Sequence, residues 1–322
     1  MKMPSFTHLA RLIRFKNLLI ITLTQAVIKY FLINPYLSET ALSNINFCIY
    51  LFALITIVAG GYIINDIYDI EIDKINKIET RIIDKEISKN FAIKTYYILN
   101  LIGVISGFYA AYQLGKWWLG LIFIYFSISL WQYSKQYKTS FIIGNLQVAF
   151  LTALSILNLA IYDLIPIGIQ RNDGSGIIFL IIIFYALFSF ITTLIREIIK
   201  DIEDIEGDRK SNSNTLAIKF GVQRTKKIII SLNIIPILGI AYFQYFQYSV
   251  LNSTFSIELS YWGVNNISAA YTVLLQVLLI TLILKVYSSY TKADFHSAST
   301  LSKTIMLMGI LSIPLFTYLH LY

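Results

Sequence analysis

The sequence has little charge. Only 14% of its 322 residues are Asp, Glu, Lys or Arg, whereas soluble globular proteins carry about 25%. Hydrophobic residues make up 57% of the chain and aromatic residues 15%. A chain of this composition has too few polar side chains to cover a surface in water, which excludes a soluble globular protein.

Cysteine and histidine are also scarce. The one cysteine, Cys48, lies inside an apolar run, which excludes an intrachain disulfide, and we expect a small buried side chain there. The three histidines are scattered and form no metal-ligand pattern. No Gly-rich phosphate-binding loop and no Ser-His-Asp set stand out. The sequence therefore gives no indication of a disulfide-stabilised, zinc-dependent or serine-hydrolase protein.

Long apolar runs are abundant. Nine segments approach the ~20 residues that a membrane-spanning helix needs, and backbone in lipid must satisfy its own hydrogen bonds, which favours helices. We therefore predict an all-α, polytopic membrane protein with nine transmembrane helices and a single domain over residues 1–322. The segments are 15–35, 46–65, 92–114, 117–134, 141–165, 176–199, 227–249, 268–290 and 302–322.

The basic residues predict the orientation of the chain. Of the 26 lysines and arginines, only Lys116 and Arg171 fall in segments expected outside, and Lys29 lies within the first run. The positive-inside rule then predicts an integral protein of the cell (inner) membrane, with a cytoplasmic N-terminus and an outer C-terminus. No basic segment resembles a module that reads nucleic acid, so we expect no nucleic-acid partner. The expected cytoplasmic segments are 1–14, 66–91, 135–140, 200–226 and 291–301.

The acidic residues gather in two places. Of the 18 Asp and Glu residues, seven fall between positions 66 and 86 and six between 197 and 208. Each cluster follows an apolar run and holds three aspartates with gaps of three and then four. At about 100° per residue, a helix would place each set on one stripe, with Glu71, Glu203 and Glu206 off it. The sets are Asp66, Asp69 and Asp73 in NDIYDIEID, and Asp201, Asp204 and Asp208 in KDIEDIEGD.

Such stripes indicate a divalent cation. Carboxylates on one helix face repel each other unless cations compensate them, and Mg²⁺ prefers oxygen ligands that it shares with substrate phosphates. A solvated, salt-bridged helix end is the simpler interpretation of one stripe alone. Two stripes of equal spacing at corresponding helix ends favour a Mg²⁺ site for a phosphorylated ligand. Basic residues in the flanking segments would neutralise a departing diphosphate: Arg81, Lys85, Lys138, Arg196 and Lys200.

These motifs resemble those of a known family. NDIYDIEID (65–73) is similar to the NDxxDxxxD motif of the UbiA superfamily of intramembrane prenyltransferases, and DIEGD (204–208) to its second, DxxxD motif. YSKQYKTSFIIGN (133–145) resembles the family's loop after the fourth helix. The sequence that surrounds the two motifs is most similar to the digeranylgeranylglyceryl phosphate synthase branch of this family. The resemblance covers nearly the whole chain and implies a UbiA-like fold with its helices around a central cavity.

The resemblance implies an enzyme that transfers a polyprenyl group, geranylgeranyl in this branch, from its diphosphate to a lipophilic acceptor. In this branch the acceptor is a prenylglycerol phosphate and the pathway is membrane lipid biosynthesis. The implied cofactor is Mg²⁺, with membrane lipid around the protein and no obligate protein partner indicated. Asp66, Asp69, Asp73, Asp204 and Asp208 would hold the metal, and Asp201 matches the extended form of the second motif.

The candidate substrate-binding residues have three sources. The resemblance implies Asn65, Arg81, Lys138 and Asn145, and charge near the second motif suggests Arg196 and Lys200. An allylic cation formed as the diphosphate departs would be stabilised by an aromatic face, for which we name Tyr68 or Tyr133.

The chain departs from the sequence of this branch at one place, and two alternative functions stay open. Where the branch reads NKPxRPI, this chain has NKIETRII (76–83), so that Arg81 is kept and both prolines are replaced, by Ile78 and Ile82. A different family member would alkylate an aromatic ring, as in quinone biosynthesis. A cation-coupled membrane transporter is an alternative of another class, because intramembrane carboxylates mark ion paths.

Overall fold

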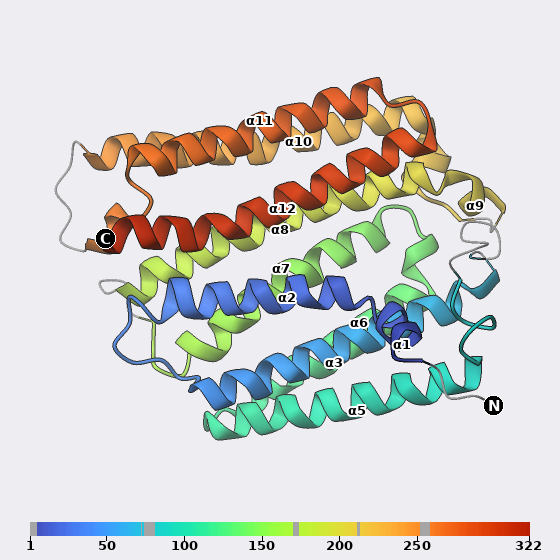
Figure 1. Cartoon of the computed structure of the whole chain (residues 1–322), viewed down its shortest axis with the longest axis horizontal. Helices are drawn as coiled ribbons and strands as arrows, with labels where there is room; N and C mark the ends of the chain where they lie inside the picture. The colour runs from blue at the N-terminus through green and yellow to red at the C-terminus, as the bar shows by residue number, and fades with distance from the viewer. Residues whose placement is uncertain (1–4, 72, 74–80, 170–173, 211–212, 252–257) are drawn as a thin grey trace. The chain divides into compact units, whose positions relative to one another are not determined.

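The computed structural model describes residues 5–71, 73, 81–169, 174–210, 213–251 and 258–322. Within these ranges every regular element is a helix, apart from an isolated bridge between Ile83 and Ile87 (Figure 1). Eight helices of the described chain are long and apolar enough to cross a membrane. The predicted all-α, polytopic membrane fold is confirmed.

The long helices follow the predicted apolar runs. The first run forms α2 (Phe15–Val27) and then a π-helix, η1 (Ile28–Ile33), and the others, except 117–134, each lie in a single helix. Gly221, at φ 76°, kinks the start of α10. The remaining long helices are α3 (Asn44–Tyr68), α5 (Lys89–Gln113), α7 (Ile143–Leu164), α8 (Gly174–Glu203), α10 (Leu216–Leu251), α11 (Asn266–Ser288) and α12 (Lys292–Leu321).

The predicted span at 117–134 is the one that differs. It forms a 3₁₀ turn, η2 (Trp117–Gly120), followed by α6 (Leu121–Lys135), which has only 15 residues. Gly120 lies against α5, because a Cβ there would meet Cδ1 of Phe108 at 2.5 Å. The tight turn thus replaces the first turn of the predicted helix. The other short elements are α1 (Phe6–Leu12), η3 (Tyr137–Thr139), α9 (Ile205–Lys210) and η4 (Glu258–Tyr261).

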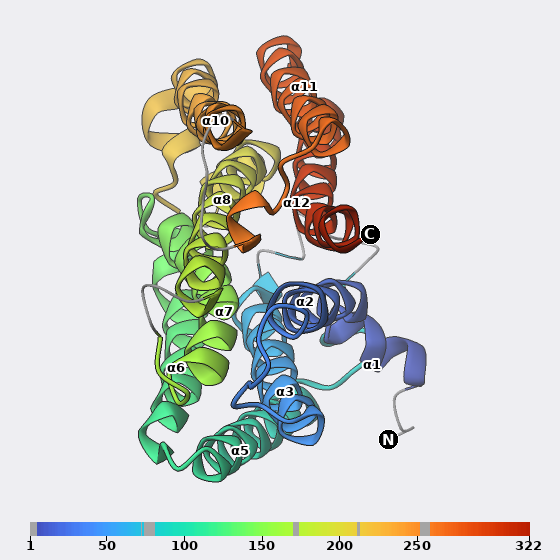
Figure 2. The same cartoon turned by 90° about the vertical axis from the view of Figure 1, so that its left-hand side faces the viewer.

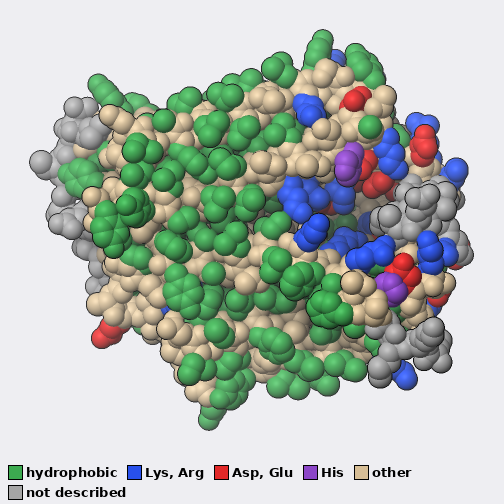
Figure 3. Space-filling view, in the orientation of Figure 1, with side chains coloured by type: hydrophobic (Ala, Val, Ile, Leu, Met, Phe, Trp, Pro, Cys, Tyr) green, Lys and Arg blue, Asp and Glu red, His purple; other side chains and the backbone are tan. Residues whose placement is uncertain are grey.

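The chain divides into two compact units. Unit 1 comprises residues 1–23, 41–147 and 204–215, and unit 2 comprises 24–40, 148–203 and 216–322. Helices α3, α5 and α6 pack together in unit 1, and α8, α10, α11 and α12 in unit 2 (Figure 2). In each unit hydrophobic side chains cover most of the helical surface in view, and charged side chains gather toward helix ends (Figure 3). The single domain and the central cavity stay predictions.

Small residues bring the helices of unit 1 together. A Cβ at Gly103 of α5 would lie 2.6 Å from Cγ1 of Ile57 and 2.7 Å from Oγ1 of Thr56, both on α3. Ser127 of α6 donates a hydrogen bond of 2.6 Å to Oδ1 of Asn100 on α5. Close backbone approach and hydrogen bonds between helices are what hold helices together in lipid. They fix α3, whose last turn carries the first acidic motif.

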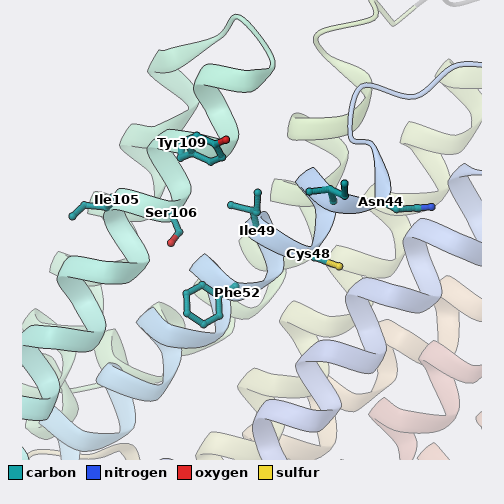
Figure 4. Close-up of a pocket in the computed structure, with 8 residues that line it drawn as sticks. Asn44, Cys48, Ile49, Phe52, Ile105, Ser106 and Tyr109 are labelled. Atoms are coloured by element: carbon teal, nitrogen blue, oxygen red, sulfur yellow. The ribbon is translucent and has the colours of Figure 1, made fainter.

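An open groove of about 680 Å³ lies between α3 and α5, along the half of α3 remote from the acidic motif (Figure 4). Its lining includes Cys48, Phe52 and Tyr109. Cys48 is exposed there, so the expectation of a buried cysteine is wrong. The thiol lines the groove and takes no part in the tight α3–α5 contact.

Unit 2 contains a buried ion pair within its apolar helices. Nζ of Lys29 in η1 lies 2.6 Å from Oδ2 of Asp163 on α7 and 3.1 Å from Oγ1 of Thr40. The two charged side chains are 1% and 0% exposed. A charge inside an apolar helix needs a partner, and Asp163 supplies it for Lys29.

Removing one member of this pair is expected to destabilise the protein. Lys29→Met or Asp163→Asn leaves the other charged group buried without its partner, at a cost of about 3–5 kcal/mol. The double variant Lys29→Met/Asp163→Leu leaves no buried charge and is expected to recover most of that loss. Thermal unfolding in detergent tests this, and single variants that melt like the unchanged protein would contradict it.

Candidate active site

The first acidic motif continues the helical pattern beyond α3. The amide of Asp69 donates to the carbonyl of Asn65 at 3.0 Å, and that of Asp73 to the carbonyl of Asp69 at 2.7 Å. Asp69 and Asp73 are buried, at 2% and 7% exposure, whereas Glu71 is exposed. The aspartates therefore turn inward and the glutamate outward, as the helical stripe predicts.

Asp69 is the centre of a small hydrogen-bonded group. Nδ2 of Asn65 donates to Oδ2 of Asp69 at 2.8 Å, and Nζ of Lys138 contacts the same oxygen. Asn65 is itself buried, so its amide fixes the rotamer of the carboxylate. The structure thus brings together three of the residues that the sequence predicts for the site.

Asp66 has a partner that sequence reasoning missed. Nη2 of Arg14 donates to Oδ1 of Asp66 at 2.8 Å, and the guanidinium lies 4.8 Å from the centre of the Tyr62 ring. Burial is the largest single influence and lowers the pKa of Arg14, but the charge and hydrogen bond of Asp66, with the nearby Tyr62 and Asp69, together raise the pKa above its usual value. The cation is thus permanent.

Arg14 also has an unusual backbone. Its φ is 52°, in the left-handed region that residues other than glycine seldom adopt. It lies between α1 and α2, at the point where the chain enters its first span. Such strain persists only where the surroundings enforce it, and it is frequent at functional sites.

Lys138 is held by a compact turn after α6. It lies in η3, and α7 begins five residues later, at Ile143. A Cβ at Gly144 would meet the carbonyl oxygen of Tyr137 at 2.5 Å, so only glycine lets α7 approach the turn this closely. Asn145 follows as a buried residue and Tyr133, on α6, is partly buried.

Apolar packing positions the segment around Arg81. Ile82 and Ile83 pack with the cluster formed by Leu12, Ile63, Ile64, Ile70, Ile87, Ala92 and Tyr96. Ile82 stands where the related branch has its second proline, and its packing against this cluster, where it is partly buried, supplies an anchor in place of the rigid ring. Nε of Arg81 is buried and has no hydrogen-bond partner among the described residues. Ile78 and the rest of 74–80 lie outside the described residues.

The second motif is not one continuous helix. Helix α8 ends at Glu203, and α9 begins at Ile205, so Asp204 lies at the break. Carboxylates are unfavourable at a helix C-terminus and favourable at an N-terminus, because of the helix dipole. Ending α8 before Asp204 puts Glu206 and Asp208 in the first turn of α9. The predicted single stripe through Asp201, Asp204 and Asp208 is therefore interrupted.

The residues of the second motif are divided between the two units at this break. Asp201 belongs to unit 2, whereas Asp204 and Asp208 belong to unit 1 with the first motif. The amide of Asn214 donates to the carbonyl of Thr139 at 2.8 Å, which ties the segment after the second motif to the turn that carries Lys138.

Arg196 and Lys200 lie in unit 2, near the end of α8. Nη1 of Arg196 donates to Oε1 of Glu197 at 2.8 Å, and Nζ of Lys200 lies 4.0 Å from the other oxygen of that carboxylate. Nε of Arg196 is buried without a hydrogen-bond partner among the described residues. Tyr68, the other aromatic candidate, is 43% exposed at the end of α3.

The donor set suits Mg²⁺, although the described residues contain no group of three or more His, Cys, Asp and Glu side chains close enough to hold a metal. The candidate ligands are all carboxylate oxygens, which this ion prefers. Arg14 and Lys138 contact two of those carboxylates, so basic side chains stand beside the candidate ligands. The unpartnered Nε of Arg81 is a donor available to an anion.

Comparison with known proteins gives a consistent result. Residues 30–308 match the UbiA prenyltransferase family. The digeranylgeranylglyceryl phosphate synthase of Sulfurisphaera tokodaii is 34% identical over 201 residues, which are 62% of this chain and 67% of that protein. The synthase of the same name from Methanosphaera stadtmanae is 32% identical over 259 residues, 79% of this chain and 81% of that protein.

Solved structures share the fold. One, described as giving structural and mechanistic insights into digeranylgeranylglyceryl phosphate synthase in membranes, aligns with 97% of this chain and 98% of its own, at a TM-score of 0.64 and 22% identity. A UbiA homolog from Archaeoglobus fulgidus, bound to GPP and Mg²⁺, aligns with 95% of this chain and 99% of its own, at a TM-score of 0.56 and 14% identity.

Replacing Gly144 by alanine is expected to disturb the turn that carries Lys138. The new Cβ would overlap the Tyr137 carbonyl, and such overpacking costs about 1–3 kcal/mol. Gly239→Ala is the matched control, because a Cβ at this helical position would meet only Cε2 of Phe184, at 3.9 Å. Thermal unfolding should show a lower melting temperature for Gly144→Ala alone; equal melting temperatures for the two variants would contradict the close approach.

Proposed function

This chain belongs to the UbiA prenyltransferase family, and from that premise we propose that it transfers a geranylgeranyl group from its diphosphate to a prenylglycerol phosphate in membrane lipid biosynthesis. One observation carries the proposal. Asp66 and Asp69, at the end of an apolar helix, are each in contact with a cationic side chain that comes from another part of the chain. The names of the most similar relatives support the choice of donor and acceptor.

The aspartates of both motifs would hold Mg²⁺ in this proposal: Asp66, Asp69, Asp73, Asp204 and Asp208. The ion supplies neutralising charge to the diphosphate, which makes it a better leaving group. Arg14 and Lys138 touch the same carboxylates and are therefore within reach of a diphosphate held beside them. Nε of Arg81 provides a further donor.

The proposed reaction is a substitution at the allylic carbon of the prenyl diphosphate. The bond between that carbon and the diphosphate oxygen breaks, and its electron pair leaves with the diphosphate. The acceptor's hydroxyl oxygen forms the new carbon–oxygen bond, and its proton passes to the departing diphosphate. Asn65 orients Asp69 through the 2.8 Å hydrogen bond, and the apolar surroundings limit capture of the allylic cation by water.

The proposed location is the cell membrane, with the N-terminus and both acidic motifs on the cytoplasmic side and the C-terminus outside. The distribution of lysine and arginine supports this orientation. It also agrees with the chemistry, because a charged diphosphate would reach the carboxylates from the aqueous cytoplasm while its prenyl tail stays in the membrane.

Substitutions in the two motifs are expected to abolish transfer. Asp69→Ala removes the carboxylate that holds Asn65 and Lys138, and Asp204→Ala removes the one at the end of α8. Glu71→Ala is the control, because this neighbouring carboxylate is exposed. Turnover of geranylgeranyl diphosphate with Mg²⁺ should vanish in both aspartate variants and persist in the control. Full activity in both aspartate variants would refute the assigned metal site.

The acceptor is tested directly by product analysis. Purified protein is incubated with geranylgeranyl diphosphate, Mg²⁺ and either a prenylglycerol phosphate or an aromatic quinone precursor, and the lipid products are identified by mass spectrometry. We expect an ether product with the glycerol phosphate. Product with the aromatic acceptor alone would replace the proposal by the alternative within the same family.

A further inference from the structure

Unit 2 contains a second cavity that the proposed reaction does not use. It has a volume of about 290 Å³ and lies between α8, α10, α11 and α12. On α8 its lining comes from residues 177–188, in the first half of a helix whose last turn carries the second motif. The cavity is therefore at the other end of α8 from the acidic residues.

The lining is mostly apolar, and four of its polar side chains already have hydrogen-bond partners. The hydroxyl of Tyr185 lies 2.5 Å from Oγ of Ser312, which donates to the carbonyl of Gly309 at 2.6 Å. Oγ1 of Thr272 donates to the carbonyl of Ala269, and Nε1 of Trp262 to Oγ1 of Thr317. None of the described residues that line the cavity is charged, so the cavity suits hydrocarbon.

The cavity has an open side and a closed side. On α8 and α10 the lining residues Leu180 and Tyr242 are 66% and 70% exposed, whereas Trp262 and Leu275 at the inner side are 5% exposed. Both helices cross the membrane, so the exposed apolar side chains that flank the opening face lipid tails and not water.

We propose that this cavity binds the hydrocarbon chain of one bilayer lipid, which enters between α8 and α10 and packs against Trp262. The volume lies just below the range for ligand pockets, about 300–1,000 Å³, and admits part of one chain without a head group. The position inside a four-helix packing makes the chain a structural component of unit 2. The inference does not depend on the prenyl-transfer reaction.

Trp262 reports directly on occupancy. A protein that keeps only this tryptophan, with Trp117, Trp118 and Trp131 replaced by Phe, is placed in phosphatidylcholine bilayers with or without bromine near the end of an acyl chain. Bromine quenches tryptophan fluorescence at short range. We expect Trp262 to lose fluorescence in the brominated bilayer to the same extent as a protein that keeps only Trp118, which is 46% exposed.

Substitutions at two neighbouring leucines distinguish quenching by a lipid chain inside the cavity from quenching by lipid at the protein surface. Leu275→Phe fills the cavity and should restore Trp262 fluorescence, whereas Leu274→Phe, at a residue 44% exposed, should leave the quenching unchanged. Ile181→Phe fills the cavity from α8 and serves if Leu275→Phe fails to fold, which circular dichroism would show.

Three results would overturn the inference. Trp262 could keep its full fluorescence in the brominated bilayer, as expected for a tryptophan in a closed cavity. The quenching could survive both cavity-filling substitutions. Geranylgeranyl diphosphate could relieve it, which would assign the cavity to the tail of the prenyl donor.

Discussion

Carboxylates at the end of an apolar helix have to be compensated by cations, and this requirement organises the charged part of unit 1. Arg14 compensates Asp66, and Lys138 compensates Asp69. Each cation comes from a different segment of the chain, so the same contacts that balance the charge also fasten loops and helix starts to the motif-bearing helices.

The compensation explains why the site is built from distant segments. Arg14 stands before the first span and Lys138 after α6, yet both meet the end of α3. The backbone contact between Asn214 and Thr139 adds the segment that follows the second motif. Carboxylates and basic side chains lie side by side, so a metal ion and a diphosphate would each meet groups of opposite charge. The catalytic proposal rests on this alternation of charge.

Much of this could be predicted from periodicity. The apolar runs located the spans, and the three-and-four spacing placed Asp69 and Asp73 inward with Glu71 outward. Arg14 could not be found in this way, because a basic residue before a first span is also what the positive-inside rule requires. Its positive φ is a signal that only coordinates contain.

The errors have physical causes of the same kind. A helical stripe was extended through Asp204, but the dipole of α8 disfavours further carboxylates at its C-terminus, and the helix ends at Glu203. Residues 117–134 were taken as one helix because their composition is apolar throughout. Composition does not report that Gly120 packs against Phe108 and tightens the first turn.

The central claim is that a prenyl diphosphate binds at the acidic motifs through Mg²⁺, and phosphorus NMR tests it most directly. Geranylgeranyl diphosphate is added to the purified protein in detergent, first with a chelator and then with Mg²⁺. The account predicts that both phosphorus resonances shift and broaden on binding only when Mg²⁺ is present. Equal shifts with the chelator and with Mg²⁺ would contradict it, because the carboxylates would then take no part in holding the diphosphate.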